Sequence, residues 1–361
     1  MQALGSAWRT KPRGRGIGGE RSRLNGKESR ERETEFQGIF QRSFKEWSMI
    51  TFNERVEGIT VATLSNQYGT AEISLYGGHI LSYRPEGEED VLFMSSASAF
   101  ERGKPIRGGI PVCFPWFGPR FDNPALPPHG FARISTWKTV SFEEAGKGST
   151  LVLGLSDSAE SRKQWPYRFA AALAVTLGER LTASLSVTNT GDEPFSFTDA
   201  FHTYFRIPDI GTARVTGLAG TEYYDRVGAG APAPEGDPWP RKPETGEIRF
   251  AGEMDRVYLS DKDRTIEGAE PVRGPGTGAN ALSGDTAAGR RALKPVTVKS
   301  EGFPDSVVWN PGETKGAAIA DLGPLEWRKF VCVESGAVFN HRVSVEPGAT
   351  AYQAMTIETG K

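Results

Sequence analysis

Two residues of this 361-residue sequence have the side chains that an acid–base reaction needs. His202 lies among aromatic residues in segment 201–205 (Phe-His-Thr-Tyr-Phe), where burial lowers the pKa of an imidazole and a neighbouring carboxylate raises it. A pKa near neutrality suits a general acid at physiological pH. Glu334 ends the apolar run 330–334 (Phe-Val-Cys-Val-Glu), which indicates a cavity or rim. Taken singly, a buried structural histidine and a solvent-exposed strand-end glutamate also explain these patterns.

Four further residues have side chains that bind anions or sugar hydroxyls. Arg107 precedes a pair of glycines, which allow the backbone to approach a ligand closely, and arginine suits phosphate. His129 and Arg133 lie four positions apart in a turn next to an expected strand, and Asp255 opens a short apolar strand. In isolation, an irregular packing loop or a surface position explains each of them as well.

The elements that must position these residues are expected to be short β-strands. Apolar and polar residues alternate along segment 181–189, with Leu181, Ala183, Leu185 and Val187 on one face, and Gly191-Asp192 then predicts a turn. Similar runs occupy residues 60–64, 71–76, 149–155, 169–177, 195–198 and 296–299. Strands at this spacing predict an all-β protein built as a large antiparallel β-sandwich.

Composition divides the chain into a tail and one expected domain. Residues 1–47 are rich in arginine and have no acidic residue before Glu20, so we expect a disordered tail or an organelle transit segment. Residues 48–361 are expected to form a single domain, with Pro/Gly-rich loop insertions near 228–246 and 268–294. The expected location is the cytoplasm, or a plastid or mitochondrion if residues 1–47 direct transport.

Charge and cysteine content exclude several classes of function. The formal net charge of −2 gives no basic footprint for nucleic acid, and the apolar runs are too short to span a bilayer. Cys113 and Cys332 lie too far apart in sequence for a disulfide framework or a metal-ligand spacing. We therefore expect no cofactor, no bound metal, no nucleic-acid or membrane partner, and a monomer that acts on a small molecule.

Six segments, taken in order, resemble the motifs of the hexose-6-phosphate mutarotases (glucose-6-phosphate 1-epimerases), a family of the galactose mutarotase-like group. The resemblance runs from about residue 59 to residue 357 and implies a supersandwich of β-sheets. The segments are 106–111 (Ile-Arg-Gly-Gly-Ile-Pro), 129–133 (His-Gly-Phe-Ala-Arg), 201–205 (Phe-His-Thr-Tyr-Phe), 255–258 (Asp-Arg-Val-Tyr), 308–311 (Val-Trp-Asn-Pro) and 331–334 (Val-Cys-Val-Glu).

The resemblance implies a role for each candidate residue. His202 and Glu334 match the catalytic pair of the family, while Arg107 and Arg133 match arginines that favour a phosphorylated sugar. Asp255 matches a sugar-binding carboxylate, and His129 lies beside the substrate pocket. This sequence departs from the family at Pro128, where the family usually has glutamine, so a hydrogen bond from that amide to the sugar is lost.

The implied reaction is the interconversion of the α and β anomers of a hexose 6-phosphate. Ring opening moves a proton from the C1 hydroxyl to a base and another from an acid to the ring oxygen, so one acid and one base suffice. Two alternatives stay open. One is an aldose mutarotase or epimerase for a non-phosphorylated or different sugar. The other is a sugar-phosphate-binding protein without turnover.

Overall fold

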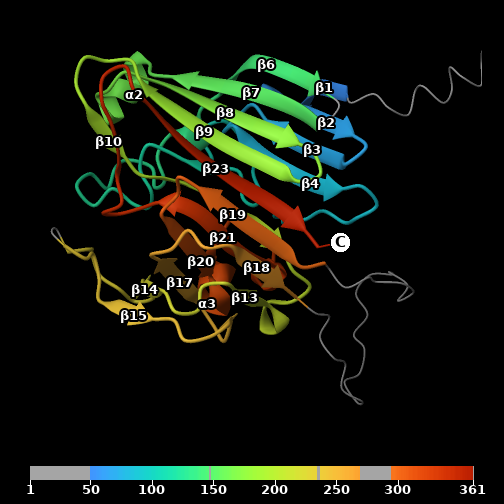
Figure 1. Cartoon of the computed structure of the whole chain (residues 1–361), viewed down its shortest axis with the longest axis vertical. Helices are drawn as coiled ribbons and strands as arrows, with labels where there is room; N and C mark the ends of the chain where they lie inside the picture. Colours follow the sequence, from blue (N-terminus) through green and yellow to red (C-terminus); the bar gives the residue numbers. More distant parts are fainter. Residues whose placement is uncertain (1–48, 146–147, 234–235, 269–293, 361) are drawn as a thin grey trace, which may run out of the picture. The chain divides into compact units, whose positions relative to one another are not determined.

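The computed structural model describes residues 49–360, except 146–147, 234–235 and 269–293. The expected tail or transit segment 1–47 lies outside the described residues, and so does most of the expected insertion 268–294. Strands dominate the described residues, which confirms the predicted all-β class (Figure 1). No helix in the described part of the chain is both long and apolar enough to cross a membrane.

A four-stranded antiparallel sheet contains the first described strands. They are ordered in space as β1 (Met49–Val56), β2 (Ile59–Asn66), β3 (Gly69–Ser74) and β4 (His79–Pro85). Segment 60–64 lies in β2 and most of segment 71–76 lies in β3, as predicted; β3 buries alternate residues Ala71 and Ile73, whereas β2 buries residues of both faces. The face with Ala62, Leu64, Ala71 and Ile73 packs into the main apolar core, and Ile59 and Val61 on the other face join a smaller cluster.

A nine-stranded antiparallel sheet forms the central layer. Its order is β16 (Ile248–Arg249), β13 (Arg214–Thr216), β18 (Arg264–Glu267), β19 (Val296–Glu301), β23 (Thr350–Thr359), β9 (Leu181–Asn189), β8 (Phe169–Leu177), β7 (Gly148–Ser156) and β6 (Lys138–Ala145). In β9, Leu181, Ala183, Leu185 and Val187 are all buried, which confirms the predicted face. Segments 149–155, 169–177 and 296–299 are also strands, as predicted.

An eight-stranded sheet carries the candidate residues. Along its main path the order is β15 (Arg241–Pro243), β14 (Glu222–Asp225), β17 (Met254–Tyr258), β20 (Asp305–Asn310), β21 (Phe330–Ala337), β11 (Asp199–Phe201) and β5 (Val112–Cys113), and β12 (Tyr204–Arg206) also pairs with β21. The segment 228–246, expected as a loop insertion, contributes edge strand β15 to this sheet. A separate two-stranded ribbon joins β10 (Phe195–Phe197) to β22 (Val343–Val345).

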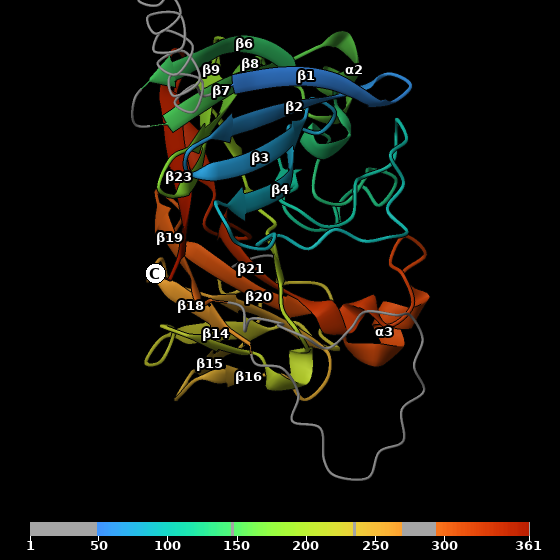
Figure 2. The same cartoon turned by 90° about the vertical axis from the view of Figure 1, so that its right-hand side faces the viewer.

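The three large sheets pack face to face, and most of their buried apolar side chains form one large cluster. β2 and β3 contact β7 and β8, so the four-stranded sheet covers that half of the central layer (Figure 2). The other half faces the eight-stranded sheet, and Val298 and Met355 of the central layer belong to the same core as Val308 and Val333 of that sheet. This packing of two sheets against one central sheet is the predicted supersandwich.

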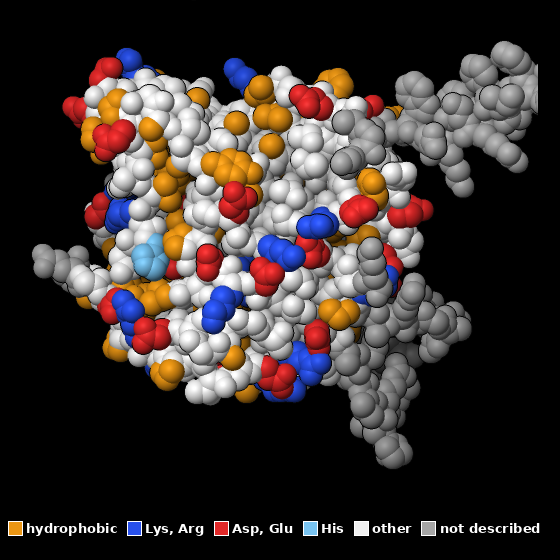
Figure 3. Space-filling model, viewed as in Figure 1, with side chains coloured by type: hydrophobic (Ala, Val, Ile, Leu, Met, Phe, Trp, Pro, Cys, Tyr) orange, Lys and Arg blue, Asp and Glu red, His pale blue; other side chains and the backbone are white. Residues whose placement is uncertain are grey.

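In the part of the chain that the structure describes, helices are short and lie at the margins of the sheets. They are α2 (Ala159–Gln164), α3 (Gly312–Ala318) and the 3₁₀ turns η1 (Ala132–Ile134), η2 (Ile210–Thr212) and η3 (Glu326–Lys329). On the face drawn in Figure 3, acidic and basic side chains are interspersed rather than gathered into one patch, in keeping with a net charge of −2. Recognition of a charged ligand therefore depends on local groups.

Candidate active site

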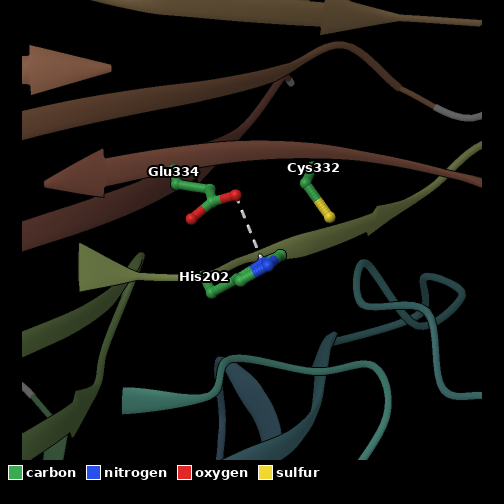
Figure 4. Close-up of side chains that lie close together, drawn as sticks. All are labelled: His202, Cys332 and Glu334. Atoms are coloured by element: carbon green, nitrogen blue, oxygen red, sulfur yellow. Dashed lines mark ion pairs between the residues drawn. The ribbon is translucent and has the colours of Figure 1, made fainter. Parts of the chain in front are cut away.

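His202 and Glu334 lie opposite each other on two neighbouring strand segments. β11 and β12 both pair with β21 in one continuous register, and His202 stands in the short gap between them. Because Phe201 lies opposite Ser335, the next residue, His202, lies opposite Glu334. His202 Nδ1 is 3.3 Å from Glu334 Oε1 (Figure 4). The structure thus brings together two residues that are 132 positions apart (334 minus 202).

Aromatic neighbours and one backbone hydrogen bond fix the orientation of His202. Its ring stacks on Tyr204 with a centroid distance of 4.9 Å and an interplanar angle of 8°, and it meets Trp309 edge to face at 5.8 Å. The backbone N–H of His202 donates to the carbonyl of Pro111 at 3.0 Å. These contacts hold the imidazole toward Glu334, and Nδ1 has no hydrogen-bond partner among the described residues.

Burial favours the uncharged form of both His202 and Glu334. His202 is 8% exposed and Glu334 is 1% exposed. Desolvation raises the pKa of Glu334, Asp255 raises it further, and Arg226 and Arg133 oppose this. Desolvation, Arg133 and Arg107 lower the pKa of His202. Both shifts favour the uncharged forms in the substrate-free protein, a neutral imidazole and a protonated carboxyl group.

Asp255 shares the sheet face of the pair and is bound to an arginine that the sequence reasoning missed. Arg226, directly after β14, lies opposite Asp255 because Asp225 pairs with Arg256. Its Nη1 is 3.3 Å from Asp255 Oδ1, and its guanidinium lies 5.0 Å from the ring centre of Phe339. Burial raises the pKa of Asp255, and Arg226 opposes this rise. Arg226 thus places a positive charge next to the half-buried carboxyl group of Asp255 and near the buried one of Glu334.

Arg107 is linked to His202 by Tyr204, which contacts both residues. Its Nη1 donates to Tyr204 Oη at 3.0 Å, and Tyr204 is the ring that stacks on His202. Nε and Nη2 of Arg107 lie 3.1 and 3.0 Å from Asp321 Oδ1. Tyr204 and Asp321 together raise the pKa of Arg107, so this guanidinium is a permanent cation with a carboxylate partner. Sequence reasoning missed Asp321 as well.

Arg133 differs from Arg107 because it has no carboxylate partner within the described residues. It lies in η1, is 9% exposed, and donates from Nη2 to the carbonyl of Pro128 at 2.8 Å. Its Nε is buried without a hydrogen-bond partner in the described part of the chain. A buried guanidinium with free donor capacity is suited to an incoming anion.

His129 closes the loop side of the site. Its backbone is in the left-handed region with φ of 63°, and its ring lies 5.4 Å from the ring of His202. Nδ1 accepts a hydrogen bond from the N–H of Gly118 at 3.3 Å and lies 3.4 Å from Cys113 Sγ. Burial and Arg133 lower its pKa, which favours the neutral imidazole, and the hydrogen bond accepted at Nδ1 leaves the proton on Nε2.

The paired glycines contact protein backbone, in contrast to the close approach to a ligand that the sequence suggested. A Cβ on Gly108 would lie 2.4 Å from the carbonyl oxygen of Phe93, and one on Gly109 would lie 2.2 Å from that of Ile80. Both glycines have positive φ, of 105° and 60°. They let the loop that carries Arg107 lie directly on the scaffold, which positions the arginine.

All six candidate residues predicted from the sequence surround one site. Glu334 and Asp255 project from the same face of the eight-stranded sheet, with His202 between β11 and β12 on that face, whereas Arg107, Arg133 and His129 come from loops that cover it. A supersandwich with a buried acid–base pair and arginines beside it defines a sugar isomerase of the galactose mutarotase-like class.

Comparison with known proteins agrees with this class. Over 289 residues, the chain is 35% identical to a Cenchrus ciliaris protein named "Putative glucose-6-phosphate 1-epimerase". The match covers 77% of this chain and 78% of that protein. It is 31% identical to an Escherichia coli protein of the same name, with 87% of this chain and 95% of that protein covered. A crystal structure titled as a putative mutarotase from Salmonella typhimurium superposes with a TM-score of 0.71 at 26% identity, covering 90% of this chain and 99% of that one.

More distant structures share the fold alone. A galactose mutarotase related enzyme from Lactobacillus acidophilus has a TM-score of 0.60 at 16% identity, with 83% of this chain and 97% of that chain covered.

Residues 60–358 match the sequence pattern of the family described as aldose 1-epimerase. The chain therefore belongs to the aldose 1-epimerase family.

Proposed function

We propose that this protein is a glucose-6-phosphate 1-epimerase, which interconverts the α and β anomers of a hexose 6-phosphate. One observation carries the proposal: the buried pair of His202 and Glu334, 3.3 Å apart, lies beside Arg133, a buried arginine without a carboxylate partner in the described residues. The pair supplies proton transfer, and the arginine supplies a phosphate contact. The names of the curated relatives support the same activity.

The reaction needs one group that accepts a proton and one that donates it. The base takes the proton of the C1 hydroxyl while the acid protonates the ring oxygen, so the C1 to ring-oxygen bond breaks and the aldehyde forms. Rotation about the C1–C2 bond and reclosure with the roles reversed give the other anomer. We assign the base to Glu334 and the acid to His202 in ring opening, each contributing about 10²–10⁴-fold in rate.

Substrate binding places the proton where these roles require it. Arg133 and Arg107 lower the pKa of His202 in the empty site. A phosphate dianion bound to these arginines offsets their positive potential, so the pKa of His202 rises and the shared proton moves from the Glu334 carboxyl to the imidazole. The phosphorylated substrate thereby helps to form the imidazolium that protonates its own ring oxygen.

The remaining polar groups orient the sugar. Asp255 offers an acceptor and the Nε2–H of His129 offers a donor at the site, and we assign both to sugar hydroxyls. Trp309 and Phe117 offer apolar faces at the same site, suited to the C–H face of a pyranose. Pro128 lacks the amide of the family's usual glutamine, but its carbonyl positions Arg133.

We propose that the protein acts as a monomer, with all of the assigned site residues supplied by one copy of the chain. We propose that residues 48–361 act as a single catalytic domain on a dissolved sugar phosphate. Cys113 and Cys332 are both buried free thiols, which supports a cytoplasmic location because that compartment keeps thiols reduced. Size-exclusion chromatography with light scattering tests the monomer.

Exchange spectroscopy by NMR between α- and β-glucose 6-phosphate tests the function, with glucose as the comparator. We expect acceleration of the phosphorylated sugar with a preference over glucose. Equal acceleration of both sugars would instead indicate a free-aldose mutarotase. Acceleration of neither sugar, with glucose 6-phosphate still bound, would indicate a binding protein without turnover.

A further inference from the structure

Cys332 gives the acid–base pair a third potential metal ligand. It precedes Glu334 by two positions on β21, so both side chains leave the strand on the same face and point toward His202 (Figure 4). The candidate ligand atoms of His202, Cys332 and Glu334 all lie within 4.8 Å of one another. These three are a nitrogen, a sulfur and an oxygen around one point.

Two of the ligand atoms have unused bonding capacity. Nδ1 of His202 and Oε2 of Glu334 are buried without a hydrogen-bond partner among the described residues. Cys332 is fully buried, and its thiol is reduced. Unpaired buried polar atoms cost free energy, so a ligand that bonds to them is favoured.

The identity of these atoms selects the kind of ion. Imidazole, thiolate and carboxylate are the donor types that bind Zn²⁺, and three protein ligands leave the fourth tetrahedral position open. Tetrahedral Zn²⁺ with bonds of about 2.0–2.3 Å places its ligands about 3.3–3.8 Å apart. The 3.3 Å between Nδ1 of His202 and Oε1 of Glu334 is close to this spacing. Mg²⁺ and Ca²⁺ prefer sets of six or more oxygen atoms, which these three side chains do not supply.

We propose that His202, Cys332 and Glu334 form an inhibitory binding site for a thiophilic divalent cation of the Zn²⁺ class. Bonds form from the ion to Nδ1, Sγ and a carboxylate oxygen. The S–H bond of Cys332 and any carboxyl O–H bond of Glu334 break, and their protons leave to solvent. The bound ion occupies both the base and the acid, so proton transfer to and from the sugar stops.

The charges around the site limit which ions can bind. Arg107 and Arg226 face the site but are paired with Asp321 and Asp255, whereas Arg133 has no such partner in the described residues. This residual positive charge opposes a cation that binds the carboxylate alone. A thiolate together with the Glu334 carboxylate offsets the two charges of the ion, so affinity depends on the sulfur of Cys332.

The test uses the full-length protein, with Zn²⁺ and Cd²⁺ as probes and Mg²⁺ as the hard-ion control. Equilibrium dialysis measures bound Zn²⁺, and ultraviolet absorption of the Cd²⁺–thiolate bond reports the sulfur ligand independently of activity. The variants are Cys332→Ser and Cys332→Ala, and Cys113→Ser is the matched control because Cys113 is equally buried. Circular dichroism confirms that each variant is folded, and each rate is compared with the same variant's metal-free rate.

We expect one Zn²⁺ per chain, inhibition by Zn²⁺ and Cd²⁺ but not Mg²⁺, and at least about tenfold weaker binding in both Cys332 variants, with Cys113→Ser like the wild type. Binding that is unchanged in a folded Cys332 variant, or equal inhibition by Mg²⁺, overturns the proposal. The inhibition readout rests on the proposed function, but dialysis and absorption do not. A protein without epimerase activity that forms the Cd²⁺–thiolate bond retains the site, and an active epimerase that binds no Zn²⁺ lacks it.

Discussion

Arg107 contacts Asp321 through both Nε and Nη2, at 3.1 and 3.0 Å from the same carboxylate oxygen. This pairing neutralises one of the two arginines assigned to the phosphate, while Arg133 keeps its charge uncompensated within the described residues. Asp321 therefore lies where it competes with an incoming phosphate for Arg107. The two arginines contribute to recognition in different ways, although the sequence gives them equivalent roles.

Replacing Asp321 with asparagine should strengthen binding of the phosphorylated sugar. The amide can still accept a hydrogen bond from Arg107, but it neither repels a phosphate nor neutralises the guanidinium. We expect KM for glucose 6-phosphate to fall about fivefold, the effect of roughly 1 kcal/mol, with KM for glucose unchanged. Anomerisation kinetics on both sugars measure this. A higher KM for glucose 6-phosphate would show that Asp321 mainly orients Arg107.

Replacing Arg133 with alanine should affect the phosphorylated sugar selectively. The variant loses a buried cation that is free to bind an anion, so KM for glucose 6-phosphate should rise by about tenfold or more, as expected for loss of a charge-assisted hydrogen bond. KM for glucose should change little. Arg328→Ala is the matched control, because Arg328 pairs with Asp209 away from the site. Equal losses on both sugars would remove Arg133 from the phosphate contact.

Single replacement of either member of the pair should abolish most of the rate without unfolding the protein. We expect Glu334→Gln and His202→Gln each to lower kcat by about 10²–10⁴-fold. The carboxyl of Glu334 is buried with an unpaired Oε2, so its amide should leave the free energy of unfolding unchanged or higher. Urea unfolding and anomerisation rates measured on the same samples separate the two effects. A marked fall in stability would point to a structural role.

Asp199 should make stability depend on pH. It is 1% exposed on β11, accepts one hydrogen bond from Gln353 Nε2 at 3.1 Å, and burial raises its pKa to about 8. Between about pH 4 and pH 8 the folded state keeps a proton that the unfolded state releases. The contribution of this group to stability therefore falls as pH rises through that window and is lost above the folded-state pKa.

Asp199→Asn removes this titration while keeping a similar shape. The free energy of unfolding of the variant, relative to the wild type, should increase from pH 5 to pH 8. Urea unfolding at these two pH values measures the difference. A difference that does not change with pH would show that Asp199 ionises in the folded protein as it does in the unfolded chain.

Strand patterning made much of the fold and part of the site predictable from the sequence. Alternation in segment 181–189 identifies the buried face of β9, and alternation in 330–334 places Cys332 and Glu334 on one face. Periodicity identifies which side chains share a face, but it does not tell which strands are neighbours. The family motifs supplied that information for His202 and Glu334.

Residues outside the motifs could not be placed in this way. Arg226 and Asp321 enter the site through ion pairs with residues 29 and 214 positions away, and each depends on a tertiary contact that no local pattern encodes. Arg226 is two positions after Tyr224, so the two side chains lie on the same side of the strand. This places Arg226 beside Asp255 only once β14 is known to pair with β17. The same limit applies to Pro128, whose carbonyl rather than its side chain holds Arg133.

The register that sets His202 opposite Glu334 also places the proton-transfer residues on different elements from the arginines that recognise the substrate. The acid–base pair is fixed by the pairing of β11 and β12 with β21, while Arg107 and Arg133 are held by loops that rest on that sheet. Loop changes can therefore alter which sugar is accepted without moving the proton-transfer groups. A scaffold with this division of labour suits divergence, in nature or in the laboratory, toward new sugar specificities with one conserved chemistry.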